Sequence, residues 1–223
     1  FSRALPTLMG PDTTVVTLQN GMGNAEEIAR IIPADRIYVG LCFICAMREK
    51  PGHVNHLEGG NIQFAPFIPT PEGTEKAREL SELFANAGIK TRAFDAAEQI
   101  QWYKLVWNIP FNGLCLALGG ISIAELYQNP ENVMRARRIM EEVVQAAKAR
   151  GYALPEDLVE FHLSRTETMG AFIPSSAVDY NEGRPVEYTA IWGDPLSKAR
   201  QAGASVPEWE LLDKAIRKRL NIN

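Results

Sequence analysis

The stretch Thr13-Thr-Val-Val-Thr-Leu-Gln-Asn-Gly-Met-Gly-Asn24 runs from β-branched and apolar residues directly into a glycine-rich turn. A short run of β-branched residues is typical of a buried strand. Gly23 or Asn24 can then cap a helix over residues 25–32, whose early glutamates suit the positive end of a helix. A strand, a tight turn and a helix in immediate succession predict an α/β fold.

The same alternation of strand and helix signals continues downstream of this stretch. We expect a strand over 36–46, hairpin strands over 53–55 and 61–65 joined at Gly59-Gly60, a helix over 71–86 ended by Gly88, and a strand over 90–94. This succession favours a sheet with helices packed on it.

Beyond residue 94 the pattern becomes helical. A long apolar helix is expected over 96–118, followed by helices over 130–150, 155–165 and 188–202 and a last one that begins at Pro207. We therefore predict two domains, an α/β domain over residues 1–94 and an all-helical domain over residues 95–223.

Composition narrows the functional classes. The 223 residues include 23 basic and 27 acidic side chains, so the formal net charge is −4 and no basic field favours nucleic acid or an anionic membrane. No apolar run reaches the roughly 18 residues of a membrane span, and no secretory leader opens the chain. Three cysteines are too few for a disulfide framework, which indicates a cytoplasmic protein. Because the chain opens on Phe1 rather than Met, we expect it to be a fragment.

Cys42 and Cys45, followed by His53 and His56, have residue types that can bind a metal. Only seven residues separate the two pairs, whereas finger-type zinc sites place about twelve between them. The cysteines also lie in an apolar, strand-like run, where cysteine packs as a small hydrophobic side chain. We expect buried thiols and no metal.

The turn Gly21-Met-Gly23 resembles part of a dinucleotide-binding fingerprint. That fingerprint requires a third glycine three residues after the second, and Glu26 stands there instead. A glycine turn at the end of a strand explains the pattern better. It still places Asn20 at the carboxyl edge of the sheet, where open α/β sheets bind ligands.

Three polar residues interrupt the apolar helix 96–118. Lys104, Asn108 and Asn112 recur every fourth residue and so share one helix face. One interpretation is structural, with a lysine that extends to solvent above two hydrogen-bonded amides. The other is a cleft in which an ammonium donates a proton and two amides orient a carbonyl substrate.

The segments Ile173-Pro-Ser-Ser-Ala-Val-Asp179 and Gly183-Arg-Pro-Val-Glu187 also leave two interpretations open. Ser175 and Ser176 can cap a helix, and Glu187 can be an acid in the first turn of the next one. Both can instead belong to a site. The arginines at 135, 137 and 138 are expected to pair with Glu141 and Glu142 on a solvated helix face.

Taken together, these residues resemble the ketopantoate reductase (2-dehydropantoate 2-reductase) family. The matching blocks cover nearly the whole chain in order: residues 14–23, 51–54, 104–108, 175–179, 183–187 and 203–207. The resemblance implies a Rossmann-type NADPH-binding domain followed by a helical domain of the 6-phosphogluconate dehydrogenase C-terminal-like type. It also implies that NADPH reduces a 2-oxo acid, with ketopantoate reduced to pantoate in pantothenate and coenzyme A biosynthesis.

The resemblance also implies residue roles. Lys104 matches the catalytic lysine that acts as general acid, and Glu187 matches the active-site acid near it. Asn108, Asn112 and Ser175 match substrate-contacting positions, and Asn20 matches a loop asparagine near the nicotinamide. The expected partners are a small 2-oxo acid and a second copy in a homodimer.

The sequence departs from the family pattern in three ways. Gly113 stands where the family usually has proline, and Ala177 stands where methionine is frequent. The glycine-rich fingerprint and first βα units, roughly 60–80 residues at about 30 per unit, have no counterpart. Two alternatives therefore stay open: a non-catalytic helical interaction or dimerisation module derived from the family, and a related reductase with another 2-oxo acid substrate.

Overall fold

A computed structural model describes residues 1–222, apart from the side chains of residues 47–48 and 57–58. The chain forms two compact units, Phe1–Gln101 and Trp102–Asn223, and the division falls inside helix α4 (Ala97–Ala117). The domain boundary predicted at residue 94 stays a prediction.

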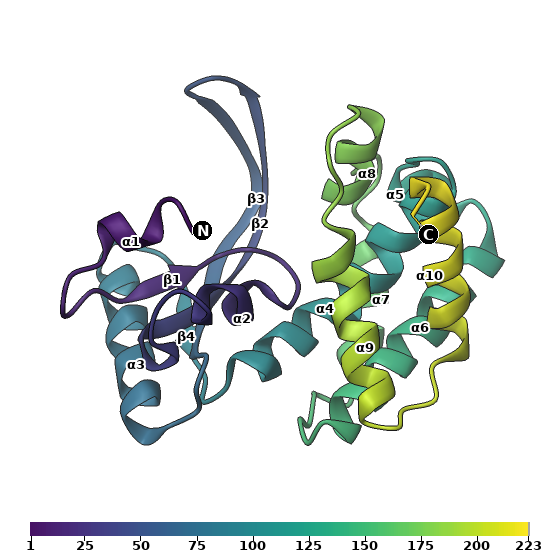
Figure 1. The fold of residues 1–223 in the computed structure, drawn as a ribbon. Coiled ribbons are helices and arrows are strands. Elements are labelled where there is room, and N and C mark those ends of the chain that lie inside the picture. The colour runs from purple at the N-terminus through teal and green to yellow at the C-terminus, as the bar shows by residue number, and fades with distance from the viewer. Residues whose placement is uncertain (223) are drawn as a thin grey trace. The chain divides into compact units, whose positions relative to one another are not determined.

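Within the described residues, the first unit is built on a sheet with strand order β1-β2-β3-β4 (Figure 1). The strands are β1 (Val15–Thr17), β2 (Ile37–Lys50), β3 (His53–Pro66) and β4 (Thr91–Ala93). β1 is parallel to β2 and β4 is parallel to β3, whereas β2 and β3 are antiparallel. The helices of this unit are α1 (Leu5–Leu8), α2 (Asn24–Ala29), the 3-10 turn Ala34–Arg36 and α3 (Pro71–Asn86).

Both faces of the sheet are covered, as a strand with alternating buried residues requires. Ile37, Val39 and Leu41 pack on one face with Ala25 and Ile28 of α2. On the other face, Tyr38 and Phe64 pack with residues of α3, including Ala77 and the partly buried Leu80 and Phe84. This arrangement confirms the predicted α/β architecture.

The hairpin differs from the prediction. The chain turns at Pro51 and Gly52, between β2 and β3, and not at Gly59-Gly60. Ile44 pairs with Gly59 and Phe43 with Asn61, so Gly60 is an extra residue that forms a bulge. A Cβ at Gly59, where φ is +81°, would lie 2.3 Å from the Phe43 carbonyl oxygen, so only glycine fits there.

The second unit is helical over its described residues. The rest of α4 is followed by α5 (Ile123–Tyr127), α6 (Pro130–Ala149), α7 (Leu158–Glu167), α8 (Ser175–Asn181), α9 (Asp194–Gln201) and α10 (Pro207–Leu220). The expected helix 188–202 is confirmed over residues 188–201, and its first part is a π-helical turn, η2 (Thr189–Gly193), continued by α9. No helix among the described residues is both long enough and apolar enough to cross a membrane.

The arginine cluster of α6 pairs across helices, and the expected pairing with Glu142 is wrong. Arg137 pairs with Glu160 of α7, and Arg138 pairs with Glu131 and with Glu208 of α10. Glu142 is buried and accepts the backbone N–H groups of Glu208 and Trp209 at 2.9 and 2.8 Å. A carboxylate of α6 thus caps the start of α10.

Candidate functional site

Helix α4 carries the polar face that the spacing predicts. The helix continues through Pro110, and Lys104, Asn108 and Asn112 lie one turn apart along it. Lys104 is half-buried, and the side chains of Asn108 and Asn112 are only 5% and 2% exposed. Buried amides in an otherwise apolar helix need partners, because an unpaired buried polar group costs about 1–3 kcal/mol.

The two amides differ in their partners. The Asn112 Oδ1 atom accepts the Ser176 backbone N–H at 3.1 Å and the Ser175 hydroxyl at 3.5 Å. Among the described residues, no hydrogen bond is formed by the side chain of Asn108. The structural interpretation from the sequence, two hydrogen-bonded amides, therefore fits Asn112 and not Asn108.

Helix α8 begins at Ser175, so the interpretation of the paired serines as its cap is wrong. Pro174 occupies the N-cap position and provides no side-chain hydrogen bond. Asn112 of α4 supplies the acceptor that a serine cap would have supplied. Ser175 is exposed and Ser176 is buried, so the first serine is the one that faces solvent.

Glu187 lies between α8 and η2. The residue is exposed, yet partial desolvation of its carboxyl group raises its pKa, and the negative charge of Asp179 raises it further. The positive charge of Lys104 acts in the opposite direction and lowers the pKa. The carboxyl group of Glu187 is thus within electrostatic reach of both Asp179 and Lys104.

Asp179 and Arg184 form a pair that sequence reasoning missed, although both lie within residues 173–187. Arg184 Nε is 2.8 Å from Asp179 Oδ1, and the Arg184 backbone N–H donates to the Asp179 carbonyl oxygen at 2.8 Å. This pair closes the turn around Gly183, where φ is +68°, and so holds the chain between α8 and Glu187. The spacing of five residues between opposite charges across a glycine is a signal that could have identified the pair.

Asn20 belongs to the other unit, in the loop that follows β1. Gly21 and Gly23 have φ values of +80° and +87°, which agrees with a glycine turn. Helix α2 has only six residues, with Glu26 and Glu27 in its first turn. The backbone carbonyl of Asn20 accepts the Asn24 side-chain amide at 3.1 Å, which fixes the turn.

The described residues contain no group of three or more histidine, cysteine, aspartate or glutamate side chains that could hold a metal ion. The expectation of buried thiols at Cys42 and Cys45 is wrong, because both are only half-buried; the third cysteine, Cys115, is buried. Both belong to β2, where residues three apart point to opposite faces of the sheet.

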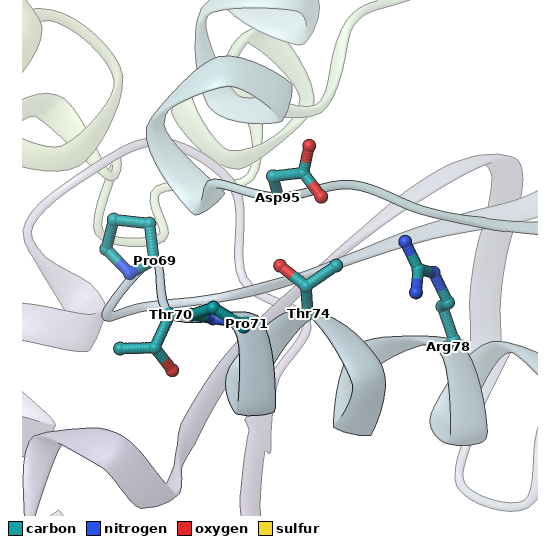
Figure 2. A pocket seen from close by; sticks show the side chains of 6 residues that line it. All are labelled: Pro69, Thr70, Pro71, Thr74, Arg78 and Asp95. Carbon is teal, nitrogen blue, oxygen red and sulfur yellow. The ribbon is translucent and has the colours of Figure 1, made fainter.

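An open pocket of about 400 Å³ lies at the start of α3. Figure 2 shows its lining residues, which include Thr70, Thr74, Arg78 and Asp95. The pocket is at the sheet edge where β3 ends, because Pro66 pairs with Tyr38 near the beginning of β2. β1 runs in the same direction as β2, so the Asn20 loop lies at the opposite edge. The pocket contains none of the residues predicted from the sequence.

Comparisons with known proteins match both parts of the chain. Residues 96–219 match the family model described as ketopantoate reductase PanE/ApbA C terminal, and residues 2–69 match the model described as ketopantoate reductase PanE/ApbA. A 2-dehydropantoate 2-reductase of Nostoc sp. is 35% identical over 209 residues, which cover 92% of this chain and 65% of that protein. The chain therefore spans just under two thirds of the length of this relative.

Solved structures agree with these matches. A 2-dehydropantoate 2-reductase from Geobacter metallireducens is 37% identical with a TM-score of 0.88, over 94% of this chain and 69% of that one. A D-mandelate dehydrogenase solved with NADH and anilino(oxo)acetate is 23% identical with a TM-score of 0.86, over 98% and 71%, and shares the fold. With a family model that covers more than half of its residues, the chain belongs to the ketopantoate reductase family.

Proposed function

We propose that the protein containing this chain reduces a 2-oxo acid to a 2-hydroxy acid with a reduced nicotinamide cofactor. The most specific form of this proposal is the NADPH-dependent reduction of ketopantoate to pantoate, a step in pantothenate and coenzyme A biosynthesis. The observation that carries it is the polar face of α4, where Lys104 interacts with Glu187 and the buried Asn108 has no hydrogen-bond partner among the described residues.

The proton step is assigned to Lys104. Reduction of a ketone leaves negative charge on its oxygen, which must receive a proton. A half-buried ammonium can donate that proton from Nζ, and its positive charge stabilises the developing alkoxide before the transfer. Glu187 offsets the charge of Lys104, so the ammonium is not left unpaired in a partly desolvated site.

Asn108 and Ser175 are assigned to the substrate. The Asn108 amide is buried one turn beyond Lys104, and an oxo-acid oxygen would satisfy its donor. Ser175 presents an exposed hydroxyl at the start of α8. Both groups can orient a carboxylate or carbonyl relative to Lys104, which lowers the entropic cost of reaction.

The described residues do not fit the pyrophosphate of a dinucleotide. The first turn of α2 carries Glu26 and Glu27, whose carboxylates would repel phosphate, and the helix is only six residues long. We therefore assign only Asn20, in the loop at the carboxyl end of β1, to the nicotinamide end of the cofactor. When bound, the reduced nicotinamide supplies the hydride.

The test is a steady-state assay of the complete protein that contains this sequence. Oxidation of NADPH, and in parallel NADH, is followed with ketopantoate and with other 2-oxo acids. Lys104→Ala is expected to lower kcat/KM for the preferred acid by about 100-fold or more, because positioned general acids contribute about 10²–10⁴-fold.

Lys214→Ala is the matched control, since it removes an exposed lysine of α10. This variant should keep kcat/KM unchanged. An unchanged kcat/KM in Lys104→Ala would refute the general-acid assignment. Absence of turnover with every 2-oxo acid and both cofactors would refute the proposed function itself.

A further inference from the structure

Tyr188 follows Glu187 directly and is tied to α10 through its hydroxyl group. The Tyr188 hydroxyl donates to Asp213 Oδ1 at 2.6 Å, and Arg217 donates to the same hydroxyl at 3.3 Å. The Arg217 guanidinium also lies 5.8 Å from the centre of the Tyr188 ring. Asp213 is only 6% exposed, so this contact also supplies a partner to a buried carboxylate.

The turn that Tyr188 opens is anchored at its other end as well. Trp192 stacks on Tyr188 with ring centres 6.3 Å apart, and its Nε1 donates to the Ile109 carbonyl oxygen of α4 at 3.0 Å. Ile109 is the neighbour of Asn108. The π-helical turn η2, which follows Tyr188 and contains Trp192, is therefore attached to α10 at its start and to α4 near its end. Such π-turns frequently occur at functional sites.

These contacts determine where Glu187 can lie. Its carbonyl oxygen accepts the Ile191 N–H at 3.1 Å, so its backbone belongs to the same turn. This inference rests on the proposed function, in which the Glu187 carboxylate offsets the charge of Lys104. For that role the carboxylate must stay close to the Lys104 ammonium. We propose that Tyr188, held by Asp213 and Arg217, is a positioning residue that keeps Glu187 beside Lys104.

The Tyr188 hydroxyl can donate its hydrogen bond throughout the neutral pH range. Burial and the neighbouring Asp213 raise the pKa of Tyr188 to about 12, so the group stays protonated and donates at neutral pH. Neither Tyr188 nor Asp213 needs to touch the substrate for this role. Their effect reaches the reaction through the placement of Glu187.

The test compares three variants of the protein. Tyr188→Phe removes the hydroxyl and keeps the ring, and Asp213→Asn keeps an oxygen acceptor for the hydroxyl. Tyr127→Phe is the matched control, because the Tyr127 hydroxyl donates to the Leu163 carbonyl at 3.0 Å in the same helical unit. The measurements are thermal unfolding, kcat and KM for the 2-oxo acid, and the titration of the Glu187 side-chain carboxyl by ¹³C NMR, assigned with Glu187→Gln.

Tyr188→Phe is expected to lower kcat about tenfold with KM changed less than about twofold, since small displacements of catalytic groups are costly. The Glu187 titration should move in the same variant, because its distances to Lys104 and Asp179 change. Asp213→Asn and Tyr127→Phe should keep both properties. A wild-type kcat and Glu187 titration in a folded Tyr188→Phe protein would overturn the inference.

The two proposals fail separately. If the unmodified protein turns over no 2-oxo acid, the proposed function is lost, and the Glu187 titration still decides the positioning role. If Tyr188→Phe does not fold, Asp213→Ala removes the acceptor and leaves Tyr188 in place. An unchanged Glu187 titration in that variant would then overturn the inference.

Discussion

Asn108 and Asn112 are the same residue type on the same buried face, and their different surroundings separate binding from positioning. Asn112 is engaged by the start of α8, where it accepts hydrogen bonds from Ser175 and Ser176. Asn108 has no such partner among the described residues. The resemblance implies substrate contact for both, whereas the geometry favours that role for Asn108 and a supporting role for Asn112.

This contrast predicts that replacing asparagine by alanine changes the free energy of unfolding differently at positions 108 and 112. Asn112→Ala leaves the Ser176 N–H without its acceptor and should lower the free energy of unfolding by about 1–2 kcal/mol, as other helix-cap losses do. Asn108→Ala removes the same atoms from a site of similar burial and should cost less. Urea unfolding of both variants measures the difference, and equal losses would show that the Asn112 bonds add nothing.

At the scale of elements, the close approach of α4 to α10 and η2 depends on Gly113. A Cβ built there would lie 2.7 Å from Leu212 Cδ2 and 2.9 Å from Trp192 Nε1. Trp192 cannot withdraw freely, because its Nε1 is bonded to Ile109. The glycine that replaces the usual family proline therefore has a packing reason in this chain.

Gly113→Ala is predicted to destabilise the helical unit. In an exposed helix this change would stabilise by up to about 1 kcal/mol. Here the added methyl overfills a packed contact, which typically costs about 1–3 kcal/mol, so the net change should be a loss. Chemical denaturation gives the value. A Leu212→Ala background removes the shortest of these contacts and leaves the one with Trp192, so the same substitution should then cost less without becoming neutral.

Helix α3 and the β2–β3 hairpin show which elements local sequence signals can predict. Helix α3 has the predicted bounds, because its signals are local: Thr70 caps it, Pro71 begins it and Gly88 follows it. The glycine pair at 59–60 misled the hairpin prediction, because positive φ values occur in bulges as well as in turns. Only the cross-strand register, a non-local property, separates the two.

The candidate site shows the same division. The polar face of α4 follows from a four-residue spacing, and the spacing predicted it. The contacts of α4 with α8 and η2 join residues 64 and 83 positions apart in the chain, and no local pattern encodes such contacts. The contacts of Asp213 and Trp192 could therefore be found only in the folded structure.

For the whole molecule, we predict that stability at acid pH depends on a buried histidine. His162 of α7 is 7% exposed and its Nε2 atom has no hydrogen-bond partner among the described residues. Burial lowers its pKa from 6.5 to about 4, with a further contribution from Arg165, although a hydrogen bond to the Tyr103 backbone opposes the shift. Protonation would place an unpaired charge in the core of the helical unit.

The sign of the pH effect follows from the two pKa values of His162. Because the folded value lies below the unfolded one, the unfolded chain binds more protons between about pH 4 and 6.5. The contribution to folding is complete above pH 6.5 and is lost as the pH falls, by about 2 kcal/mol at pH 5.

His162→Gln keeps a donor for the Tyr103 carbonyl and does not titrate, so its unfolding free energy should fall less between pH 7 and 5. His53→Gln, a change at an exposed histidine of β3, should keep the wild-type difference. Urea unfolding at both pH values decides the matter, and an equal fall in wild type and His162→Gln would assign the acid sensitivity to other groups.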